Sequence, residues 1–550
     1  MIFVVKIIHP LNSKKMKKRL LTALIAFSLL FVQNLTYSQS PTLGTAANFV
    51  LFSSVGAVTN TGITHLTGNV GTNSGSSTGF GNVDGVMHDG DGASAQSGAD
   101  LLIAYNQLKS AIPNYFPAPL LGNGQVLIPG IYSIPSVTTL NLDLTLDAKG
   151  DPNAIFIFQI EGAFSTNANS QVKLLNGAQA CNVFWKIEGL VSMATGTIMK
   201  GTVIANNAAI VMYTGVKLEG RALSTSGSIT VDGISSNIPI GCGSPVLRGP
   251  IAPNLKSTEC YAILSSNGSV TNTGVSSVTG DIGTNVGLTT GYDALNVKGQ
   301  IHPKPDTSTA QAAADLTDVY NYLNVLPHDI ELLYPAQFGN NLVLTPHTYL
   351  LKAATVFTGT VYLNAQGNAD AVFVIKMNGA LTTSTYAKVI LMNEAQAKNV
   401  YWKVEGAVVI SDYSQFNGTI VANNGAIDFL SGVSLNGRAF TTAGALSTAA
   451  VSVVMTVGCP TMSTTSFNEI QKVNIFPNPF HSFINVTIND NFEINNTQIV
   501  LYDAFGKQVK SVAVTEKLTT LETNNLGSGF YVYKIISNGK TIQTGKLLAK

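Results

Sequence analysis

The chain has 550 residues, of which 45% are hydrophobic and only 11% are charged, and its formal net charge is +1. This composition is too apolar for a disordered chain, and the length predicts two or three folded units. The near-zero net charge offers no overall field that attracts nucleic acid or anionic lipid, so we expect neither as a partner. Its 51 glycines, together with many Thr, Ser and Asn residues, favour short strands and frequent turns, which makes an all-β fold the expectation.

The N-terminal region has the pattern of an export signal. A basic stretch at residues 14–19 precedes an apolar run at residues 20–32. Signal peptides combine a charged start with a short apolar segment, so we predict that residues 1–38 are removed on export. The apolar run is too short for an ordinary membrane-spanning helix, and we expect no transmembrane segment in the mature chain. The sequence is compatible with a start at Met1 or at Met16.

Most of the chain is a duplication. Three stretches of the first copy return in the second copy at a period of roughly 215 residues, which is the size of a domain rather than of one solenoid coil. The pairs are residues 60–73 with 272–285, residues 182–189 with 399–406, and residues 201–207 with 418–424. We therefore predict two similar domains, at residues 39–243 and 257–460, joined by a linker at residues 244–256.

Each copy is predicted to be a coiled parallel sheet. Its apolar-rich segments are short, end at Gly or Asn, and lack the Asn-Gly turns that join antiparallel neighbours. Examples from the first copy are residues 154–160, 183–187, 202–205, 217–223 and 228–231. Successive segments are about one solenoid turn apart, which favours a β-solenoid over a sandwich.

One segment per copy has helical periodicity instead. In residues 94–112 the apolar positions follow helical spacing, and Pro113 marks the end. These positions are Leu101, Leu102, Tyr105, Leu108 and Ile112, and in the second copy Leu316, Val319, Tyr320, Leu323 and Leu326 before Pro327. Each copy is therefore expected to carry one amphipathic helix that covers a face of the solenoid.

The last part of the chain differs from both copies. After a Thr/Ser-rich linker at residues 461–472, short strands alternate with turn residues through residues 473–550. This pattern predicts a small C-terminal β-sandwich. The segment opens with Ile-Phe-Pro-Asn-Pro-Phe at residues 475–480 and ends with Gly-Lys-Leu-Leu-Ala-Lys at residues 545–550.

The duplicated units resemble a known family. The Thr-Gly-Asn-Val-Gly-Thr-Asn stretch at residues 67–73, the Asn-Val-Phe/Tyr-Trp strands and the Gly-Arg-Ala segments at residues 220–222 and 437–439 look like the ice-binding-like family of microbial antifreeze proteins. The resemblance implies two irregular right-handed three-faced β-solenoids, each with one long packed α-helix. It also implies ice as the partner.

The tail resembles a second family. Its Pro-Asn-Pro opening and Lys-Leu-Leu-Ala-Lys ending are similar to the C-terminal sorting domain of the type IX secretion system of Bacteroidetes. This resemblance implies that the type IX secretion machinery carries the chain through the outer membrane. The tail would then be removed, with release of the protein or its attachment to surface lipopolysaccharide.

The first resemblance also implies an ice-contacting face built from Thr-Gly/Ala-X-Thr/Asn elements. Threonine suits such a face because its methyl group orders water, its hydroxyl joins the lattice, and β-branching fixes its rotamer. Thr and Ser are also ordinary solvated strand residues, so the prediction depends on their sharing one face. The candidate ice-binding residues of the first copy are Thr61, Thr64, Thr195, Thr197, Thr214, Thr225, Ser226, Ser228 and Thr230.

The second copy departs from this pattern. Ser411-Asp412-Tyr413 stands where the first copy has Thr195-Gly196-Thr197, and Asp428-Phe429 stands where it has Val211-Met212. A charge or a large ring would interrupt a level water-ordering face. We therefore predict ice activity mainly in the first copy, where Met212 and Tyr213 are doubtful positions.

One acidic motif is interpreted as helix capping. His88-Asp89-Gly90-Asp91 could resemble a metal site, but the matching residues 302–306 carry Pro and Lys in place of ligands. Asp91 and Asp306 lie just before the predicted helices, where an Asp side chain accepts the free backbone N–H groups. We expect no metal and no cofactor.

No motif predicts catalysis. Glu161 and Glu188 lie near apolar strands, where burial would raise their pKa, but nothing in the sequence places a second carboxylate opposite them as glycoside hydrolysis needs. There is no nucleophile motif either. Trp185 and Trp402 hold the same strand position and are interpreted as core residues, with sugar stacking as the alternative. We therefore do not expect an enzyme.

Four cysteines allow three disulfide connectivities. Pairing Cys181 with Cys242 and Cys260 with Cys459 would keep each bridge inside one copy. A bridge from Cys242 to Cys260 would contradict this hypothesis.

The leading functional hypothesis is a monomeric ice-binding protein that is secreted or held at the cell surface. The alternative is a cell-surface adhesin or carbohydrate-binding protein that uses the same scaffold to bind surface polysaccharide.

Overall fold

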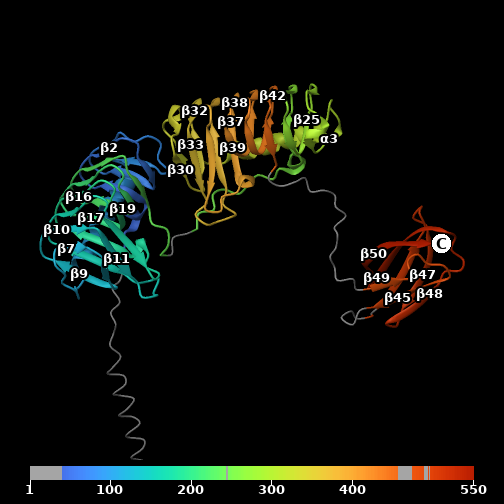
Figure 1. The fold of residues 1–550 in the computed structure, drawn as a ribbon, viewed down its shortest axis with the longest axis horizontal. Coiled ribbons are helices and arrows are strands. Elements are labelled where there is room, and N and C mark those ends of the chain that lie inside the picture. The colour runs from blue at the N-terminus through green and yellow to red at the C-terminus, as the bar shows by residue number, and fades with distance from the viewer. Residues whose placement is uncertain (1–39, 243–245, 456–472, 489–493, 495) are drawn as a thin grey trace, which may run out of the picture. The chain divides into compact units, whose positions relative to one another are not determined.

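The computed structural model describes residues 40–242, 246–455, 473–488, 494 and 496–550. The predicted signal peptide and the linker predicted at residues 461–472 lie outside the described residues. The chain forms two compact units with a boundary between Cys459 and Pro460. The first unit holds both copies of the duplication, and the second holds the C-terminal strands (Figure 1).

The first copy is a three-faced β-solenoid, and one of its faces is an eight-stranded parallel sheet that we call the open face. Inward side chains such as Val58, Ile210 and Ile229 are fully buried, while the residues between them face outward. The strands in spatial order are β5 (Ser77–Thr78), β2 (Val58–Thr61), β20 (Ile229–Asp232), β18 (Ile210–Met212), β16 (Val191–Met193), β13 (Phe164–Thr166), β10 (Thr138–Asn141) and β7 (Leu120–Gly122).

The other two faces share a 13-stranded sheet, because the long strands β17 (Ile198–Ala205) and β19 (Lys217–Ser224) turn the corner between them. At this corner a Cβ on Gly220 would lie 1.9 Å from the Gly201 carbonyl oxygen, so the two coils approach too closely for a side chain. The helix face contains the second halves of β17 and β19 with β6 (Met87–Asp89), β4 (Asn69–Thr72), β1 (Phe49–Ser53), β15 (Val183–Ile187), β12 (Phe156–Ile160) and β9 (Gly130–Ile134). The third face contains their first halves with β3 (His65–Thr67), β21 (Ser235–Asn237), β14 (Gln171–Leu175), β11 (Asp143–Asp147) and β8 (Gln125–Leu127).

The coils do not stack in chain order. The first coil, β1 to β3, pairs in parallel with the last coil, β19 to β21. After β6 and α2 (Gly92–Ser110), the chain resumes at the far end of the solenoid with β7. The first and last coils of the domain are therefore hydrogen-bonded neighbours inside the stack. Each depends on the other for its sheet pairing.

Helix α2 covers the helix face, as predicted. Asp91 is its N-cap and forms a capping box with Ser94. Buried side chains of the helix pack on apolar residues of strands β1, β9, β12, β15, β17 and β19: Leu101, Ala104, Tyr105 and Leu108 contact a cluster that includes Phe49, Ile131, Ile157, Phe184, Ile204 and Leu223. The predicted stripe was wrong at its margins, because Leu102 is 53% exposed and Ile112 follows the helix at 84% exposure.

Aromatic rings of successive coils stack inside the first solenoid. The rings of Phe158 and Trp185 lie 3.9 Å apart, and those of Tyr132 and Phe158 lie 5.2 Å apart. Trp185 is fully buried and donates its indole N–H to the Lys200 carbonyl at 2.9 Å. Trp402 is equally buried, which confirms both tryptophans as core residues.

The second copy repeats this architecture, with helix α3 (Thr307–Val325) capped by Asp306. Its open face contains β26 (Thr289–Thr290), β23 (Val270–Thr273), β42 (Leu446–Ala449), β40 (Ile427–Phe429), β38 (Val408–Ile410), β35 (Leu381–Thr383), β32 (Thr355–Thr358) and β29 (Phe338–Gly339). Its 14-stranded sheet contains β22 (Tyr261–Ser265), β24 (Ser277–Thr279), β25 (Asp281–Thr284), β27 (Val297–Lys298), β28 (Ile330–Glu331), β30 (Leu342–Leu344), β31 (Thr348–Leu351), β33 (Thr360–Asn364), β34 (Phe373–Met377), β36 (Lys388–Met392), β37 (Val400–Glu405), β39 (Gln415–Asn423), β41 (Ser434–Thr441) and β43 (Ser452–Val454).

Short 3-10 helices join several of these strands. They are η1 (Gly44–Asn48), η2 (Ala180–Asn182), η3 (Lys256–Cys260), η4 (Ala294–Asn296), η5 (Pro335–Gln337) and η6 (Ala397–Asn399).

The C-terminal unit is an antiparallel β-sandwich, as predicted. One sheet contains β44 (Val473–Phe476), β45 (Phe483–Ile488) and β48 (Leu518–Glu522), and the other contains β47 (Gln508–Val514), β46 (Thr497–Tyr502), β49 (Gly529–Ser537) and β50 (Lys540–Ala549). Phe480, Ile484, Leu501 and Ile535 are buried in their shared core. Among the described residues of the whole chain, no helix combines the length and apolarity needed to cross a membrane.

Candidate functional site

The open face of the first solenoid carries a registered row of short side chains. Paired strand positions place one outward residue of each strand next to that of the neighbouring strand. The row reads Thr78, Thr59, Thr230, Val211, Ser192, Ser165, Thr139 and Leu120. Neighbouring parallel strands lie about 4.8 Å apart, so the row is a regular grid of hydroxyl and methyl groups.

Hydroxyl groups within this row contact each other. Thr59 Oγ1 lies 3.4 Å from Thr230 Oγ1, and Thr139 Oγ1 lies 3.2 Å from Ser165 Oγ. Side chains that are β-branched and laterally supported have few rotamers, so the grid is stiff.

A second row follows at the corner towards the third face. Thr61 is paired with Asp232, whose carboxylate accepts hydrogen bonds from Thr61 Oγ1 at 3.2 Å and Thr214 Oγ1 at 2.6 Å. Further along, Asn167 Nδ2 donates to Asn141 Oδ1 at 2.7 Å. Asp232 is the one charged residue in the strands of this open face.

The other faces of the first solenoid have a different character. The helix face is covered by α2. The third face carries ion pairs, with Lys173 Nζ 2.6 Å from Asp143 Oδ2 and Lys200 Nζ 2.6 Å from Glu219 Oε2. Only the open face is both uncovered and almost free of charge.

The structure distributes the predicted site residues over three places. Thr61 and Thr230 lie on the open face. Thr64, Thr195 and Thr214 lie in the turns that lead from this face to the third face, and Thr225, Ser226 and Ser228 lie in the turn that enters it.

Thr197 does not belong to a surface site. It has no exposed area, its Oγ1 lies 2.6 Å from Thr166 Oγ1, and it donates to the Ala194 carbonyl at 2.7 Å. The prediction that Thr197 contacts ice was wrong, because the Thr-Gly-Thr stretch at residues 195–197 does not indicate which hydroxyl turns inward.

The sequence reasoning missed much of the central row. Thr59, Thr78, Thr139, Ser165 and Ser192 were not selected, although each lies in a strand of this face. The available signal was alternation: most of these residues stand between two buried residues, as in Phe164-Ser165-Thr166 and Val191-Ser192-Met193. A search for Thr-Gly/Ala-X-Thr/Asn elements passes over that pattern.

The second solenoid has a comparable open face. Its row reads Thr290, Thr271, Ser447, Asp428, Val409, Thr382 and Val356. Phe429 was expected to interrupt this face, but its side chain is 1% exposed and lies in the core, as does that of Met212 in the first copy. Asp428 does face outward and accepts a hydrogen bond from Ser447 Oγ at 2.5 Å. The first open face also carries a charged residue, but Asp232 lies in its corner row, whereas Asp428 lies in the central row of the second face.

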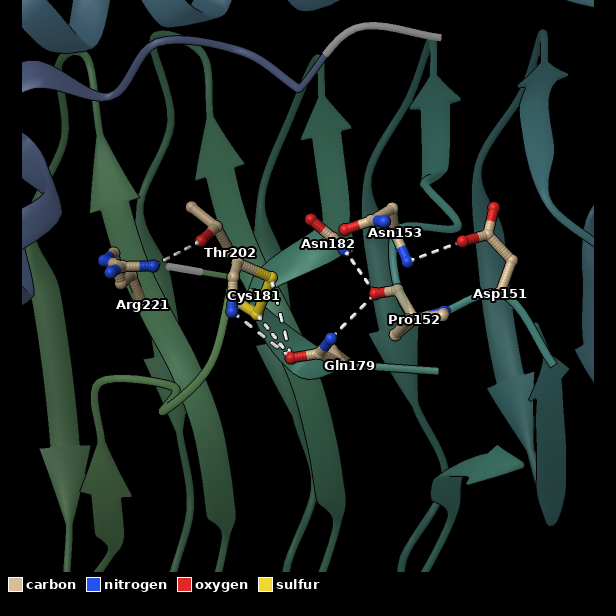
Figure 2. Close-up of a disulfide and its surroundings, with 9 residues drawn as sticks. Asp151, Pro152, Asn153, Gln179, Cys181, Asn182, Thr202 and Arg221 are labelled. Atoms are coloured by element: carbon tan, nitrogen blue, oxygen red, sulfur yellow. Dashed lines mark hydrogen bonds between the residues drawn. A yellow bond between two sulfur atoms is a disulfide. The ribbon is translucent and has the colours of Figure 1, made fainter. Parts of the chain in front are cut away.

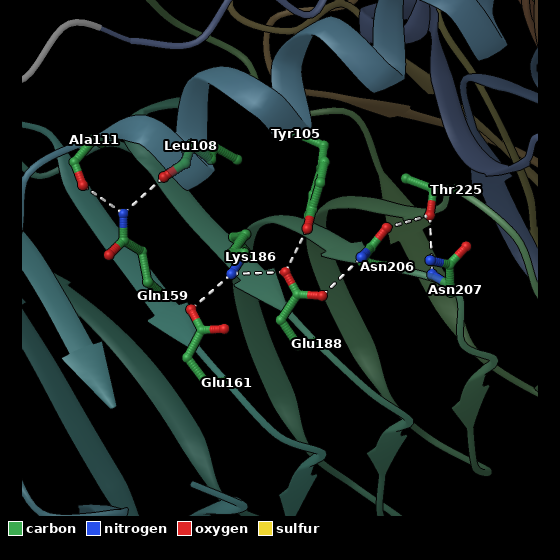
Figure 3. A network of polar contacts seen from close by, with 10 residues as sticks. All are labelled: Tyr105, Leu108, Ala111, Gln159, Glu161, Lys186, Glu188, Asn206, Asn207 and Thr225. Atoms are coloured by element: carbon green, nitrogen blue, oxygen red, sulfur yellow. Dashed lines mark hydrogen bonds and ion pairs between the residues drawn. The ribbon is translucent and has the colours of Figure 1, made fainter. Parts of the chain in front are cut away.

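A polar network on the helix face also differs from expectation. Lys186 is 1% exposed, and its Nζ lies 2.7 Å from both Glu161 Oε1 and Glu188 Oε1 (Figure 3). Two carboxylates are thus brought near each other, and a single lysine forms an ion pair with both. Burial opposes ionisation of Glu188, yet hydrogen bonds from Lys186, Tyr105 and Asn206 outweigh it and lower its pKa, contrary to the predicted rise.

This network fastens the helix rather than preparing an acid and a base. Tyr105 of α2 donates to Glu188, and Asn206 Nδ2 donates to the same carboxylate at 2.7 Å. The second copy repeats the arrangement with Lys403, Glu405, Tyr320 and Asn423. Its occurrence in both copies indicates a structural role that belongs to the scaffold.

The His-Asp motifs cap the helices, as predicted. His88 Nδ1 lies 2.6 Å from Asp91 Oδ2, and His302 Nδ1 lies 2.6 Å from Asp306 Oδ2. A backbone hydrogen bond from Ser94, together with His88, lowers the pKa of Asp91 to about 2. Among the described residues, no group of three His, Cys, Asp or Glu side chains is placed to hold a metal ion.

A disulfide closes the end of the first solenoid. Cys181 is bonded to Cys242, as predicted, and their Cα atoms lie 6.0 Å apart (Figure 2). Gln179 supports the bridge, accepting the Cys242 N–H at 3.2 Å and donating to the Pro152 carbonyl at 2.7 Å. The predicted pairing of Cys260 with Cys459 stays a prediction, because Cys459 lies outside the described residues.

Known proteins share these features. The ice-binding-like family matches residues 52–237 and 263–454, and the family of secretion system C-terminal sorting domains matches residues 474–550. An ice-binding protein of Nostoc is 40% identical over 39% of this chain and 80% of its own length. One from Typhula ishikariensis is 30% identical over 34% of this chain and 86% of its own length.

A solved structure extends the similarity to both copies. The crystal structure of an ice-binding protein from an Antarctic Flavobacteriaceae bacterium is 62% identical, covers 76% of this chain and 100% of its own, and has a TM-score of 0.76. The chain therefore belongs to the ice-binding-like family, in which it combines two such domains with a secretion system C-terminal sorting domain.

Proposed function

We propose that this protein binds ice through the open faces of its two solenoids. The observation that carries the proposal is the registered row of Thr and Ser side chains on an uncovered face with almost no charge. Its relatives of the same fold are ice-binding proteins, which supports the proposal. Methyl groups along the row order water, and the hydroxyl groups join the ordered layer, so frozen water meets a surface that already has a regular spacing.

The site residues on the first solenoid are Thr59, Thr78, Thr139, Ser165, Ser192 and Thr230, with Thr61, Thr64, Thr195 and Thr214 at the corner and Thr225, Ser226 and Ser228 at the entry turn. On the second solenoid they are Thr271, Thr290, Thr382 and Ser447. Adsorption at these residues would inhibit growth or recrystallisation of ice.

Export places this activity outside the cell. The C-terminal domain sorts the chain for type IX secretion, to the cell surface or the extracellular space. In this proposal the protein acts as a monomer, needs no cofactor and catalyses no reaction. Ice is its partner in the surroundings, and the type IX machinery is its partner during export.

Substitutions on matched positions test the proposal. Thr59→Tyr and Thr271→Tyr each place a ring in the central row of an open face, whereas Thr145→Tyr places the same ring on the third face, in β11. We expect the first two to lower thermal hysteresis and recrystallisation inhibition severalfold and the third to leave both unchanged. An inactive parent protein, or equal losses in all three variants, would contradict ice binding at these faces.

A second candidate function is binding of surface polysaccharide. Tyr386 and Tyr413 are 63% and 54% exposed, and their rings stack with centroids 5.3 Å apart beside the second open face. Both have positive φ angles, of 58° and 57°, a conformation in which a bulky residue is unusual. Loss of binding to cell-wall polysaccharide in a Tyr386→Ser, Tyr413→Gly variant, with ice activity retained, would support this function as an additional one.

A further inference from the structure

The two solenoids meet through the end coils of their stacks. Asn82 follows β5 at one end of the first open face, and its Nδ2 donates to the Tyr334 carbonyl at 3.0 Å while its Oδ1 accepts the Tyr334 N–H at 2.9 Å. Tyr334 precedes β29, the end strand of the second open face. Strand β3, on the third face of the first solenoid, contacts β30, on the third face of the second solenoid. Similar faces of the two solenoids therefore adjoin at the junction.

A buried carboxylate lies at the centre of this junction. Asp84 of the first solenoid is 3% exposed. Its Oδ1 accepts a hydrogen bond from Tyr349 Oη at 2.6 Å, and its Oδ2 accepts one from Thr345 Oγ1 at 2.8 Å. Both donors belong to the second solenoid. Docking removes the carboxylate from water, and these two hydroxyl groups supply hydrogen bonds in place of the water.

The connection between the domains is also fixed. Leu247 accepts the Asn368 side-chain amide at 3.0 Å, and Arg248 accepts the Val372 N–H at 2.8 Å. Tyr322 Oη donates to the Ile251 carbonyl at 2.7 Å. The residues of the predicted linker thus lie along the second solenoid and are hydrogen-bonded to it. Little of the linker is therefore left unattached at the junction.

The free ends of the two solenoids lack this chemistry. Lys298 occupies the position of Asp84 in the second copy, because Val297-Lys298-Gly299 matches Val83-Asp84-Gly85 and Lys298 pairs with Thr279 as Asp84 pairs with Thr67. Lys298 is exposed.

The receiving position differs too. Tyr132 of the first copy matches Tyr349, and each tyrosine hydroxyl lies within hydrogen-bond distance of the carbonyl four residues before it. That residue is Thr345 in the second copy but Ile128 in the first, where it is 41% exposed. If the two solenoids stacked in the reverse order, Lys298 would face Ile128. A lysine and an isoleucine cannot form the hydrogen bond that Asp84 forms with Thr345, so the end-to-end stack is specific for the order found in this chain.

We propose that the contact of Asp84 with Tyr349 and Thr345 locks the two solenoids into one rigid body, so that both open faces engage a single ice crystal together. The lock is a property of the fold, while the joint engagement rests on the proposed ice-binding function. A fixed junction means that the second face is already positioned when the first has adsorbed, and the second contact then costs little further entropy. Asp84 is thus a positioning residue, which contacts no ice itself.

Exchanging the residues of the docked and free ends tests the lock in the full mature chain. Asp84→Lys gives the junction the residue of the free end, and Lys298→Asp makes the reverse change where nothing is docked. Circular dichroism checks that Asp84→Lys folds. If it does not, Thr345→Ile makes the corresponding exchange on the second solenoid, with Ile128→Thr as its control. We expect the two junction variants to speed hydrogen exchange of the Tyr334 amide about tenfold or more and to broaden the distance distribution in X-ray scattering, and the two controls to do neither.

Ice assays separate the two parts of the proposal. We expect the junction variants to need about tenfold more protein for the same recrystallisation inhibition, with the controls equal to the parent. Unchanged exchange and scattering in both junction variants would overturn the lock. A loosened junction with full ice activity would overturn joint engagement alone, and an inactive parent with a rigid junction would overturn the ice-binding function while leaving the lock.

Discussion

Thr59 and Thr230 are separated by 171 residues, yet their Oγ1 atoms lie 3.4 Å apart on the open face of the first solenoid. The contact exists because the first coil pairs with the last one, which brings β2 beside β20. The two ends of the domain therefore meet within the proposed ice-binding row, one strand from its end. Loss of the last coil would remove Thr230 and also leave Thr59 at a sheet edge.

The charge on the second open face is expected to limit its activity. Asp428 stands where the first copy has Val211, and a carboxylate holds its own hydration water. Asp428→Val should raise recrystallisation inhibition severalfold, because a small apolar group then continues the row. Asp370→Val, at an exposed site outside this face, is the control. Equal activity of Asp428→Val and the parent would show that the second face tolerates the charge.

The buried hydroxyl pair is expected to serve stability alone. Thr197→Val removes a hydroxyl that contacts Thr166 Oγ1 and leaves that group without its buried partner. The free energy of unfolding should fall by about 1–3 kcal/mol, while ice activity of the folded protein stays unchanged. Chemical denaturation and thermal hysteresis below the transition measure the two quantities, with Thr145→Val on the third face as the matched control. A loss of ice activity without a loss of stability would return Thr197 to the site.

The disulfide should stabilise the first solenoid. Cys181 and Cys242 are 61 residues apart in sequence, so their bond restricts a long segment of the unfolded chain. Replacing both by Ala should cost about 2–4 kcal/mol, measured as a lower denaturant midpoint for the transition of this domain. An unchanged midpoint would mean that the coil pairing alone holds the end of the solenoid.

The cap of α2 should make stability depend on pH in the acid range. The pKa of Asp91 is lowered from 3.8 to about 2, so its ionised form stabilises the folded state fully above its ordinary pKa, and this contribution is lost as the pH falls towards 2. Asp91→Asn keeps a capping side chain but removes the titration. The difference in melting temperature between parent and variant should therefore shrink between about pH 4 and pH 2. A constant difference over this range would contradict the assignment to Asp91.

Several features were predictable from local sequence. Asp91 and Asp306 cap their helices because a short acidic side chain before a helical apolar pattern meets the unpaired N–H groups of the first turn. Trp185 and Trp402 are core residues because each is a large ring at the same position of an apolar strand, and that position is buried in both copies. In the first case the contacts lie within one segment, and in the second the same strand position is buried in both copies.

Other features depended on contacts between distant segments. The pKa of Glu188 is lowered because the side chains of Lys186, Tyr105 and Asn206 contact its carboxylate. These residues come from distant segments, and no sequence motif predicts that they lie together. Phe429 was assigned to the open face although it points into the core, because one residue of error in strand phase reverses every side chain.

The sequence by itself determined the duplication, the short parallel strands, the covering helices and the sorting tail, since these rest on periodicity and on local motifs. Only the tertiary structure decided which hydroxyls form the row, that Thr197 is internal, and that Asp84 docks on Tyr349. The reason is physical: a coil stacks on neighbours that lie far away in the chain, and its side chains are sorted inward or outward by that stacking. Spacing along the sequence records the length of a coil, but the register between coils is fixed by packing in three dimensions.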